Sequence, residues 1–226
     1  MIFSKLVPAA IIPVTPNTAL LRSFSRRAII GVLLVSILLT FTIATAGDRQ
    51  GRYAIKGAGA ENCSTYTAIR KANKPETYMY MGWLQGWLSN ENRHSKETFE
   101  LASWQHTATL LAAMNAYCND NPERPFVTGA EALITSMRAD RLKTSSLQVN
   151  AEADGRSVSL YATTLRRLQE QLHKLDFLKS QPDGLFGSTT RDAIRSYQAQ
   201  HGMKQTGLPD QAVLQQLVYS STGKER

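Results

Sequence analysis

With 226 residues, of which 42% are hydrophobic, the chain is long enough for two small domains, and its composition excludes a fibrous or disordered protein. The net charge is +8, but four basic residues and no acidic residue precede residue 47, so the remainder carries only +4. This weak excess, without a dense basic tract interleaved with aromatic residues, argues against nucleic acid as a partner.

Residues 1–46 have the features of an export leader. Basic residues precede a continuous apolar run from Ala28 to Ile43, and small residues two apart end the segment. The pattern predicts a secretory signal cleaved before Gly47. Because the run approaches the length of a membrane span, the alternative is an uncleaved inner-membrane anchor at residues 28–46. Either outcome exports the rest of the chain and predicts a periplasmic protein.

A helical domain is predicted for residues 47–137. Three segments carry apolar residues at steps of three and four, which places those residues on one face of a helix. The segments are 75–90, a longer one from Leu101 to Cys118, and 125–137. The tryptophans of these stripes are expected in the core, because a small domain needs its largest side chains inside, with an aromatic ligand platform as the alternative.

The two cysteines of the chain, Cys63 and Cys118, both lie in this domain. In an exported protein, two cysteines predict one disulfide that staples the fold. The alternative is a catalytic thiolate, which needs a free cysteine beside a base.

Three clusters give this domain a resemblance to a known group. They are Cys63-x-x-Tyr66, Gly82-Trp83-x-x-Gly86-Trp87-Leu88-x-Asn90 and Tyr117-Cys118-x-x-Asn121-Pro122. Their order resembles the small exported helical proteins of the HdeA-like and type VI secretion immunity (Rap/Tai) superfamily. The resemblance implies a disulfide-stapled bundle with a protein partner that binds through residues 61–137.

A polar segment, residues 138–158, follows this domain. It has no sustained apolar face and includes Thr144-Ser145-Ser146 and Asp154-Gly155, so it is predicted to be a linker, although residues 142–149 could dock locally. The fold expected for the whole chain is therefore all-α, with the leader helix, a disulfide-linked bundle, this linker and a C-terminal domain.

That C-terminal domain is predicted for residues 159–220, followed by a tail at 221–226. Its first helix has an apolar face formed by Tyr161, Leu165, Leu168, Leu172 and Leu175. A glycine-punctuated loop at 182–187 leads to a second helix whose start Ser188 or Thr189 can cap, and Asp210 can cap a third. Three short helices around one core are expected.

The motif Asp183-Gly184-x-Phe186-Gly187-x-x-Thr190, with Leu168, Leu172, Ala193, Ile194, Tyr197, Gln198 and Thr206-Gly207 around it, carries a second resemblance. The segment 168–217 resembles the peptidoglycan-binding modules appended to bacterial cell-wall enzymes, which implies non-catalytic binding to peptidoglycan. The ligand-binding candidates are Asp183, Gly184, Phe186, Gly187, Arg191, Tyr197 and Gln198. For Tyr197, Asp183 and the two glycines, the alternative is a purely structural role.

Catalytic and metal-binding motifs are absent from the sequence. The four histidines form no H-x-x-x-H or H-x-x-E-H pattern, and no G-x-S-x-G or Ser-x-x-Lys motif occurs, so no metal, cofactor or catalytic residue is predicted. The predicted function is an exported, non-enzymatic peptidoglycan-binding protein that tethers an interaction domain at the cell wall. One alternative is a periplasmic immunity or chaperone-like factor whose C-terminal module is structural. Another is an accessory cell-wall hydrolase with converging carboxylates.

Overall fold

A computed structural model describes residues 47–219, and these fall into two units, one that ends at Tyr53 and one that begins at Ala54. In the first unit, the Asp48 carboxylate accepts hydrogen bonds from the backbone N–H groups of Gln50 and Arg52 and closes a turn. The predicted leader at 1–46 and the tail at 221–226 lie outside the described residues. Between residues 47 and 219, no helix is both long and apolar enough to cross a membrane.

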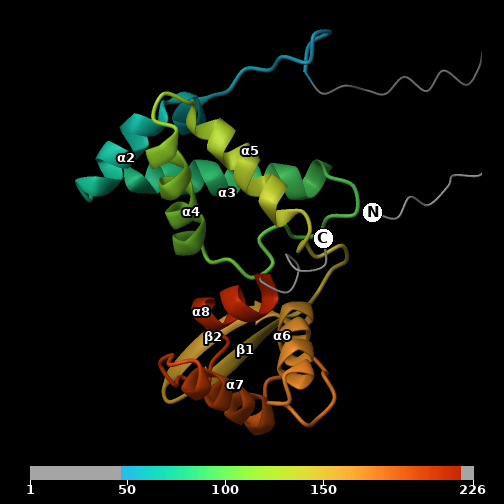
Figure 1. Ribbon diagram of the computed structural model, residues 1–226. Helices are drawn as coiled ribbons and strands as arrows, with labels where there is room; N and C mark the ends of the chain where they lie inside the picture. The colour runs from blue at the N-terminus through green and yellow to red at the C-terminus, as the bar shows by residue number, and fades with distance from the viewer. Residues whose placement is uncertain (1–46, 220–226) are drawn as a thin grey trace, which may run out of the picture. The chain divides into compact units, whose positions relative to one another are not determined.

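The second unit begins with a helical bundle (Figure 1). Its elements are η1 (Gly57–Ala60), α2 (Cys63–Lys71), α3 (Thr77–His94), α4 (Thr107–Asp120) and α5 (Phe126–Met137). Tyr66, Tyr80 and Phe126 are fully buried and pack edge to face or tilted, with ring centroids 4.9 to 5.0 Å apart. Such aromatic contacts stabilise a small core beyond the area that they bury.

The predicted disulfide is confirmed. Cys63 at the start of α2 is bonded to Cys118 in α4, 55 positions along the chain, and both side chains are fully buried. Because both cysteines of the chain are in this bond, no free thiolate is available for catalysis. The disulfide therefore acts as a staple between two helices.

The tryptophans only partly follow the prediction. The expected long helix from Leu101 is shorter, because α4 begins at Thr107 and leaves Leu101 and Trp104 in the preceding loop. Trp104 is buried in the core of the C-terminal lobe rather than in that of the bundle. Trp83 and Trp87 are partly buried on α3, where their rings stack with centroids 5.2 Å apart.

The all-α prediction is wrong in one place, because a β-hairpin occupies most of the predicted linker. Strands β1 (Gln148–Ala153) and β2 (Arg156–Tyr161) pair antiparallel around Asp154 and Gly155, which both have positive φ. Two such residues form the two-residue turn that an Asp-Gly pair favours. Ala151, Ala153 and Leu160 alternate with polar residues and are buried against the lobe, so the segment is part of the core.

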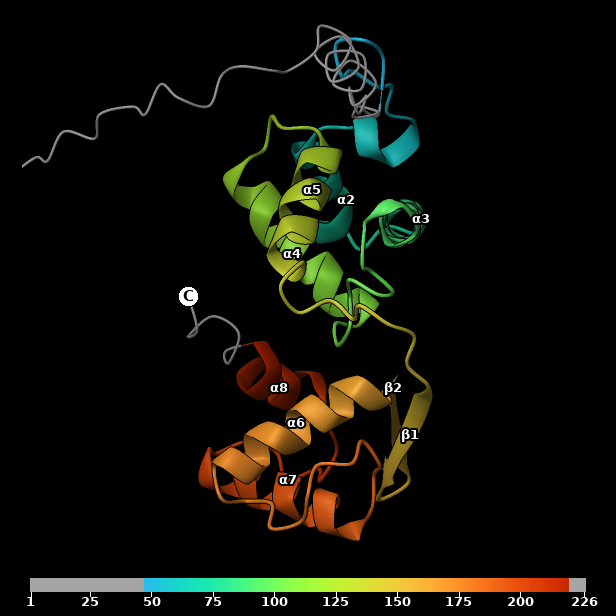
Figure 2. The same ribbon diagram turned by 90° about the vertical axis from the view of Figure 1, so that its right-hand side faces the viewer.

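Helices α6 (Ala162–Lys174), α7 (Ser188–Gln200) and α8 (Gln211–Leu214), with a final π-helical turn η2 (Gln215–Tyr219), complete the C-terminal lobe. Figure 2 shows the hairpin beside α6, and residues of both elements share one hydrophobic core. The buried core side chains of the three helices and η2 are Leu165, Leu168, Leu172, Ala193, Ile194, Tyr197, Val213, Leu214, Leu217 and Val218. The expected helices are therefore present.

Two details of the lobe differ from the prediction. Leu175 is 51% exposed, because α6 ends at Lys174 and the chain turns so that Leu178 is buried instead. Helix α7 begins at Ser188 with Gly187 as its N-cap, and no side chain caps it. Asp210, in contrast, caps α8 as predicted, since its carboxylate accepts a hydrogen bond from the backbone N–H of Val213.

Hydrogen bonds join the bundle to the lobe within the second unit. The Gln211 carboxamide donates to the carbonyl oxygen of Trp104 and accepts from the backbone N–H of His106 and the Thr109 hydroxyl. Thr164 on α6 donates its hydroxyl to the carbonyl oxygen of Ser103 at 2.7 Å. The loop before α4 is thus fixed against the lobe.

Candidate functional site

The first glycine loop of the lobe is fastened to α6 by one buried side chain, Gln169. Its side-chain oxygen accepts hydrogen bonds from the backbone N–H groups of Asp183 at 3.0 Å and Gly184 at 2.7 Å. Its side-chain nitrogen donates to the Asp183 carboxylate, to the carbonyl oxygen of Leu185 and to the Thr190 hydroxyl. Helical periodicity does not predict a buried glutamine, so the sequence gives no indication of this role.

Asp183 and Gly184 shape the loop rather than project from it. The Asp183 carboxylate accepts a hydrogen bond of 2.8 Å from the backbone N–H of Leu185, which, together with the Gln169 carboxamide, holds the pKa of Asp183 below its ordinary value. Gly184 is buried with φ +80°, and a Cβ there would lie 2.8 Å from the carbonyl oxygen of Ala162. Only glycine fits this position without strain.

The next two candidates differ in their surroundings. Phe186 is partly buried and packs against the hydrophobic core of the lobe. Gly187 is exposed, has φ −128°, and would accommodate a Cβ without any close contact. Gly187 therefore leaves the start of α7 open to solvent, whereas Phe186 anchors the loop to the core.

A second loop repeats the arrangement of the first. Gln198 on α7 is fully buried; its side-chain oxygen accepts from the backbone N–H of Gly207 at 2.8 Å, and its nitrogen donates to the Thr206 hydroxyl at 2.7 Å. Gly207, like Gly184, has positive φ. Because the hydrogen-bonding groups of Gln198 are engaged inside the protein, this candidate holds a loop in place instead of facing a ligand.

Tyr197 and Arg191 complete the set of predicted residues. Tyr197 is 3% exposed, its hydroxyl donates to the Gln216 side chain, and burial raises the pKa of its phenol. Arg191 is partly exposed, forms a 2.9 Å ion pair with Asp192, and packs its side chain beside Gly207. Of these two side chains, Tyr197 is buried and only Arg191 is accessible to solvent.

Leu185 is the surface residue that the motif leaves unspecified. Its side chain is 64% exposed, while its backbone N–H and carbonyl are both held by Asp183 and Gln169. An exposed leucine on a fixed backbone costs little conformational entropy on binding, which favours a contact role. The candidate surface is therefore defined as Asp183, Leu185, Gly187 and Arg191 at the first loop and the start of α7.

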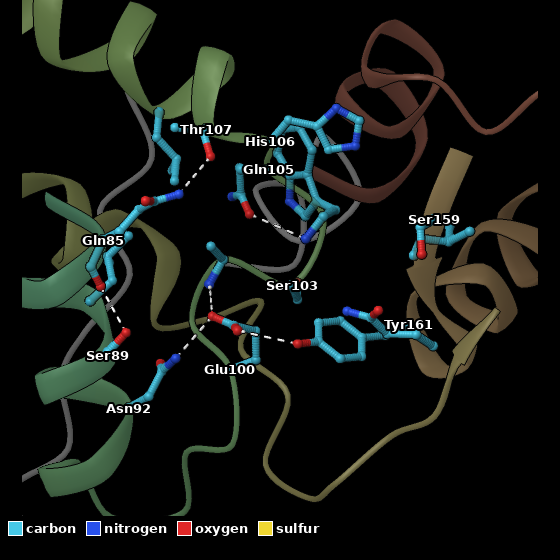
Figure 3. A pocket seen from close by; sticks show the side chains of 16 residues that line it. Gln85, Ser89, Asn92, Glu100, Ser103, Gln105, His106, Thr107, Ser159 and Tyr161 are labelled. Atoms are coloured by element: carbon cyan, nitrogen blue, oxygen red, sulfur yellow. Dashed lines mark hydrogen bonds between the residues drawn. The ribbon is translucent and has the colours of Figure 1, made fainter. Parts of the chain in front are cut away.

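A separate hollow of about 490 Å³ lies between α3, the loop before α4 and the hairpin (Figure 3). Glu100 is at one side of this hollow, where its carboxylate accepts hydrogen bonds from the Asn92 carboxamide and the Ala102 backbone, each at 3.0 Å. The Tyr161 hydroxyl points toward the same carboxylate at 3.4 Å. Burial, and to a lesser extent the charge of Glu100, raises the pKa of Tyr161 above its ordinary value.

No metal centre is formed by the described part of the chain, since residues 47–219 contain no group of three or more histidine, cysteine or acidic side chains placed to hold an ion. Glu100 and His106 both line the hollow of Figure 3 without a third such ligand.

Comparison with known proteins identifies one segment of the chain. No curated protein and no solved structure matches the chain. Residues 162–217, which include α6, α7, α8 and both glycine loops, match the family described as putative peptidoglycan binding domain.

Proposed function

We propose that the protein is an exported, non-enzymatic factor that binds peptidoglycan through its C-terminal lobe and presents the helical bundle to a protein partner. The observation that carries the proposal is the family match at residues 162–217. It coincides with two loops whose backbones are held by buried glutamines. A rigid loop with an exposed apolar tip suits binding to a repetitive polymer, where weak individual contacts add up.

The candidate surface supports this ligand. Leu185 supplies an apolar contact, and Arg191, whose guanidinium is also paired with Asp192, supplies hydrogen-bond donors at the exposed start of α7. Peptidoglycan offers both sugars and stem peptides with carboxylates, and a helix N-terminus with a nearby arginine attracts carboxylates. A shallow surface of this kind predicts a dissociation constant on the order of millimolar to micromolar for a single site.

The bundle supports the second half of the proposal. Its disulfide suits an exported protein, because such bonds persist in oxidising compartments. Tyr78 and Met79 on α3 are large hydrophobic side chains that are 71% and 52% exposed, and exposed apolar groups of this size are typical of contact surfaces. A protein partner for residues 61–137, as in the HdeA-like and Rap/Tai group, follows from the three sequence clusters of this domain.

The decisive experiment is co-sedimentation of the full chain with purified sacculi. The wild-type chain should appear in the pellet, and Leu185→Ser should weaken binding about 5-fold to 10-fold, as expected for losing one apolar contact worth roughly 1 kcal/mol. Leu175→Ser is the matched control, because Leu175 is a similarly exposed leucine of the same lobe, away from the loop. A wild-type chain that stays in the supernatant refutes peptidoglycan binding.

Export has its own test. The mass of the protein recovered from the periplasm should correspond to a chain that starts at Gly47. Recovery of the whole chain in the membrane fraction instead supports the anchor at residues 28–46, and recovery in the cytoplasm contradicts the proposed location.

A further inference from the structure

Two adjoining hollows lie on the helical bundle where α2 leads into α3 (Figure 1). The first has a volume of about 520 Å³ and lies between α2 and α4. The second has a volume of about 490 Å³ and lies between the α2–α3 loop and the start of α3. Arg70 lines both hollows. Together they form the basic groove, defined here by Arg70, Lys71, Lys74, Tyr78, Met81 and Asn115.

The lining of the basic groove is positively charged. Arg70 and Lys71 lie in the last turn of α2, and Lys74 follows in the loop, whereas no aspartate or glutamate lines either hollow. Glu76 and Asp120, the acids beside it along the chain, are outside both linings. The dipole of α2 places only about half a negative charge at this end, too little to offset three cations. The groove therefore attracts an anion.

The three cations have no acidic partner in the described part of the chain. The ion pairs within residues 47–219 include none of Arg70, Lys71 and Lys74. Most arginines and lysines that line a groove without such a partner keep their charge-assisted hydrogen bonds for water or for a ligand. A ligand carboxylate can therefore pair with them without displacing an existing ion pair.

Arg70 is held in position from inside the bundle. Burial raises the pKa of the Tyr66 phenol, while the charge of Arg70 and a hydrogen bond from its side chain lower it. Tyr66 is fully buried, and its hydroxyl donates to the carbonyl oxygen of Leu111 at 2.9 Å. A guanidinium carries several N–H donors, so a neutral phenol oxygen leaves its charge and other donors for a ligand. Arg70 therefore loses little freedom when it pairs with a carboxylate.

An apolar recess borders these charges. Met81 packs against the core of the bundle and lines the second hollow together with Leu111 and Tyr78, which is 71% exposed. Tyrosine, methionine and arginine are enriched at protein–protein interfaces. A recess of this kind accommodates one apolar side chain of a peptide, whereas the flat surface of a bilayer cannot enter it. The apolar part of the lining therefore favours a peptide over a membrane.

We propose that the basic groove binds an acidic segment of the protein partner, in which carboxylates flank one apolar residue. The carboxylates pair with Arg70, Lys71 and Lys74, and the apolar side chain occupies the recess beside Tyr78 and Met81. Recognition of an acidic motif by a basic cluster is a recurring mode of peptide binding. The inference rests on the proposed function for the existence of a partner and adds the chemistry of the segment that binds.

The test is a titration of the full, ¹⁵N-labelled chain with the peptide acetyl-Gly-Asp-Glu-Leu-Glu-Asp-Gly-amide. The backbone amide resonances of residues 70–74 should shift, with a dissociation constant on the order of a millimolar or lower at low salt. A roughly tenfold rise in salt concentration shortens the Debye length about threefold and should weaken binding about 5-fold or more. Replacing the leucine of the peptide with serine should weaken binding about 3-fold to 10-fold, because the recess then stays empty.

A matched pair of variants locates the binding. Lys71→Glu combined with Lys74→Glu reverses two charges of the groove and should weaken binding about tenfold or more. Lys96→Glu combined with Lys204→Glu makes the same change in net charge outside both hollows and should weaken it less than about 2-fold. All four lysines are exposed, so neither pair of substitutions touches the core, and dispersed spectra verify that both variants fold.

Four results overturn the proposal. They are no shift of residues 70–74 in the wild-type chain at about 10-fold above the expected constant, a shift that survives the Lys71 and Lys74 substitutions, an equal loss with the Lys96 and Lys204 substitutions, or binding to phosphatidylglycerol vesicles without binding to the peptide. The last result would make the groove a membrane contact.

The outcome is separable from that of the sacculus experiment. If the peptide fails while sacculi still sediment the chain, the inference falls and peptidoglycan binding stands. If sacculi fail, peptidoglycan binding falls, and the titration still decides the basic groove.

Discussion

The side-chain oxygen of Gln169 accepts a 2.7 Å hydrogen bond from the backbone N–H of Gly184, which joins the middle of α6 to the first glycine loop. Gln198 and Gly207 repeat this pair at the second loop with a distance of 2.8 Å. In both, a buried carboxamide satisfies a backbone donor at a residue with positive φ. The two loops are therefore rigid parts of the lobe.

Replacing Gln169 with leucine should destabilise the protein strongly. The leucine fits the volume but leaves the N–H groups of Asp183 and Gly184 without an acceptor, at a cost of about 2 to 3 kcal/mol. Urea unfolding followed by circular dichroism measures the change. Gln200→Leu, at an exposed position in the last turn of α7, is the control and should change stability by less than about 0.5 kcal/mol. Equal effects of the two substitutions contradict the role of Gln169.

The two glycines of the first loop should respond differently to alanine. Gly184→Ala forces a side chain into left-handed backbone and against the carbonyl oxygen of Ala162, so it should lower the free energy of unfolding by about 2 kcal/mol or more. Gly187→Ala meets no atom at negative φ and should be nearly neutral. Thermal unfolding of the pair distinguishes them, and a stable Gly184→Ala chain would show that the loop adapts.

Asp183 should make stability depend on pH in the acid range. Its folded pKa is lowered, so it stabilises the fold above the unfolded value of about 3.9, and this contribution is lost as the pH falls through that value toward the folded pKa. Asp183→Asn keeps the shape without the charge. The difference in urea midpoint between wild type and variant should be largest near neutral pH and shrink below about pH 4. A difference that does not change with pH rules out the charge as its cause.

The disulfide should contribute about 4 kcal/mol, the loop-entropy value for a separation of 55 residues. Replacing Cys63 and Cys118 together with alanine should lower the urea midpoint of the bundle, as should reduction of the wild-type chain. Adding reductant to the double variant is the control and should have no further effect. An unchanged midpoint for the reduced wild-type chain contradicts the assignment of the staple.

The hairpin should be needed for the C-terminal lobe. A fragment that starts at residue 157 lacks β1 and with it the buried side chains of Ala151 and Ala153, whereas one that starts at 147 retains both strands. The longer fragment should be more stable by about 2 kcal/mol or more, since it keeps the strand pairing and the buried area. Equal melting temperatures would show that the three helices suffice.

Sequence alone determined most of the helices of the C-terminal lobe, the disulfide and the loop positions, because each depends on local or pairwise rules. Apolar spacing placed Leu165, Leu168 and Leu172 on one buried face, and a chain with two cysteines allows one intramolecular pairing. The sequence also contains the Asp154-Gly155 pair, and Ala151 and Ala153 alternate with polar residues. Together these features signal a hairpin, but the polar composition of the segment favoured a linker.

Only the tertiary structure decided which of the residues around the first loop are exposed. Gln198 and Tyr197 belong to the family motif, yet the fold buries both, whereas Leu185, which no motif marks, is exposed on a fixed backbone. The hollow at Glu100 and Trp104 is lined by α3, by the loop before α4 and by β2. Strand β2 follows Glu100 by more than fifty residues along the chain. Periodicity describes one element at a time, so the environment of a polar side chain depends on neighbours that only packing supplies.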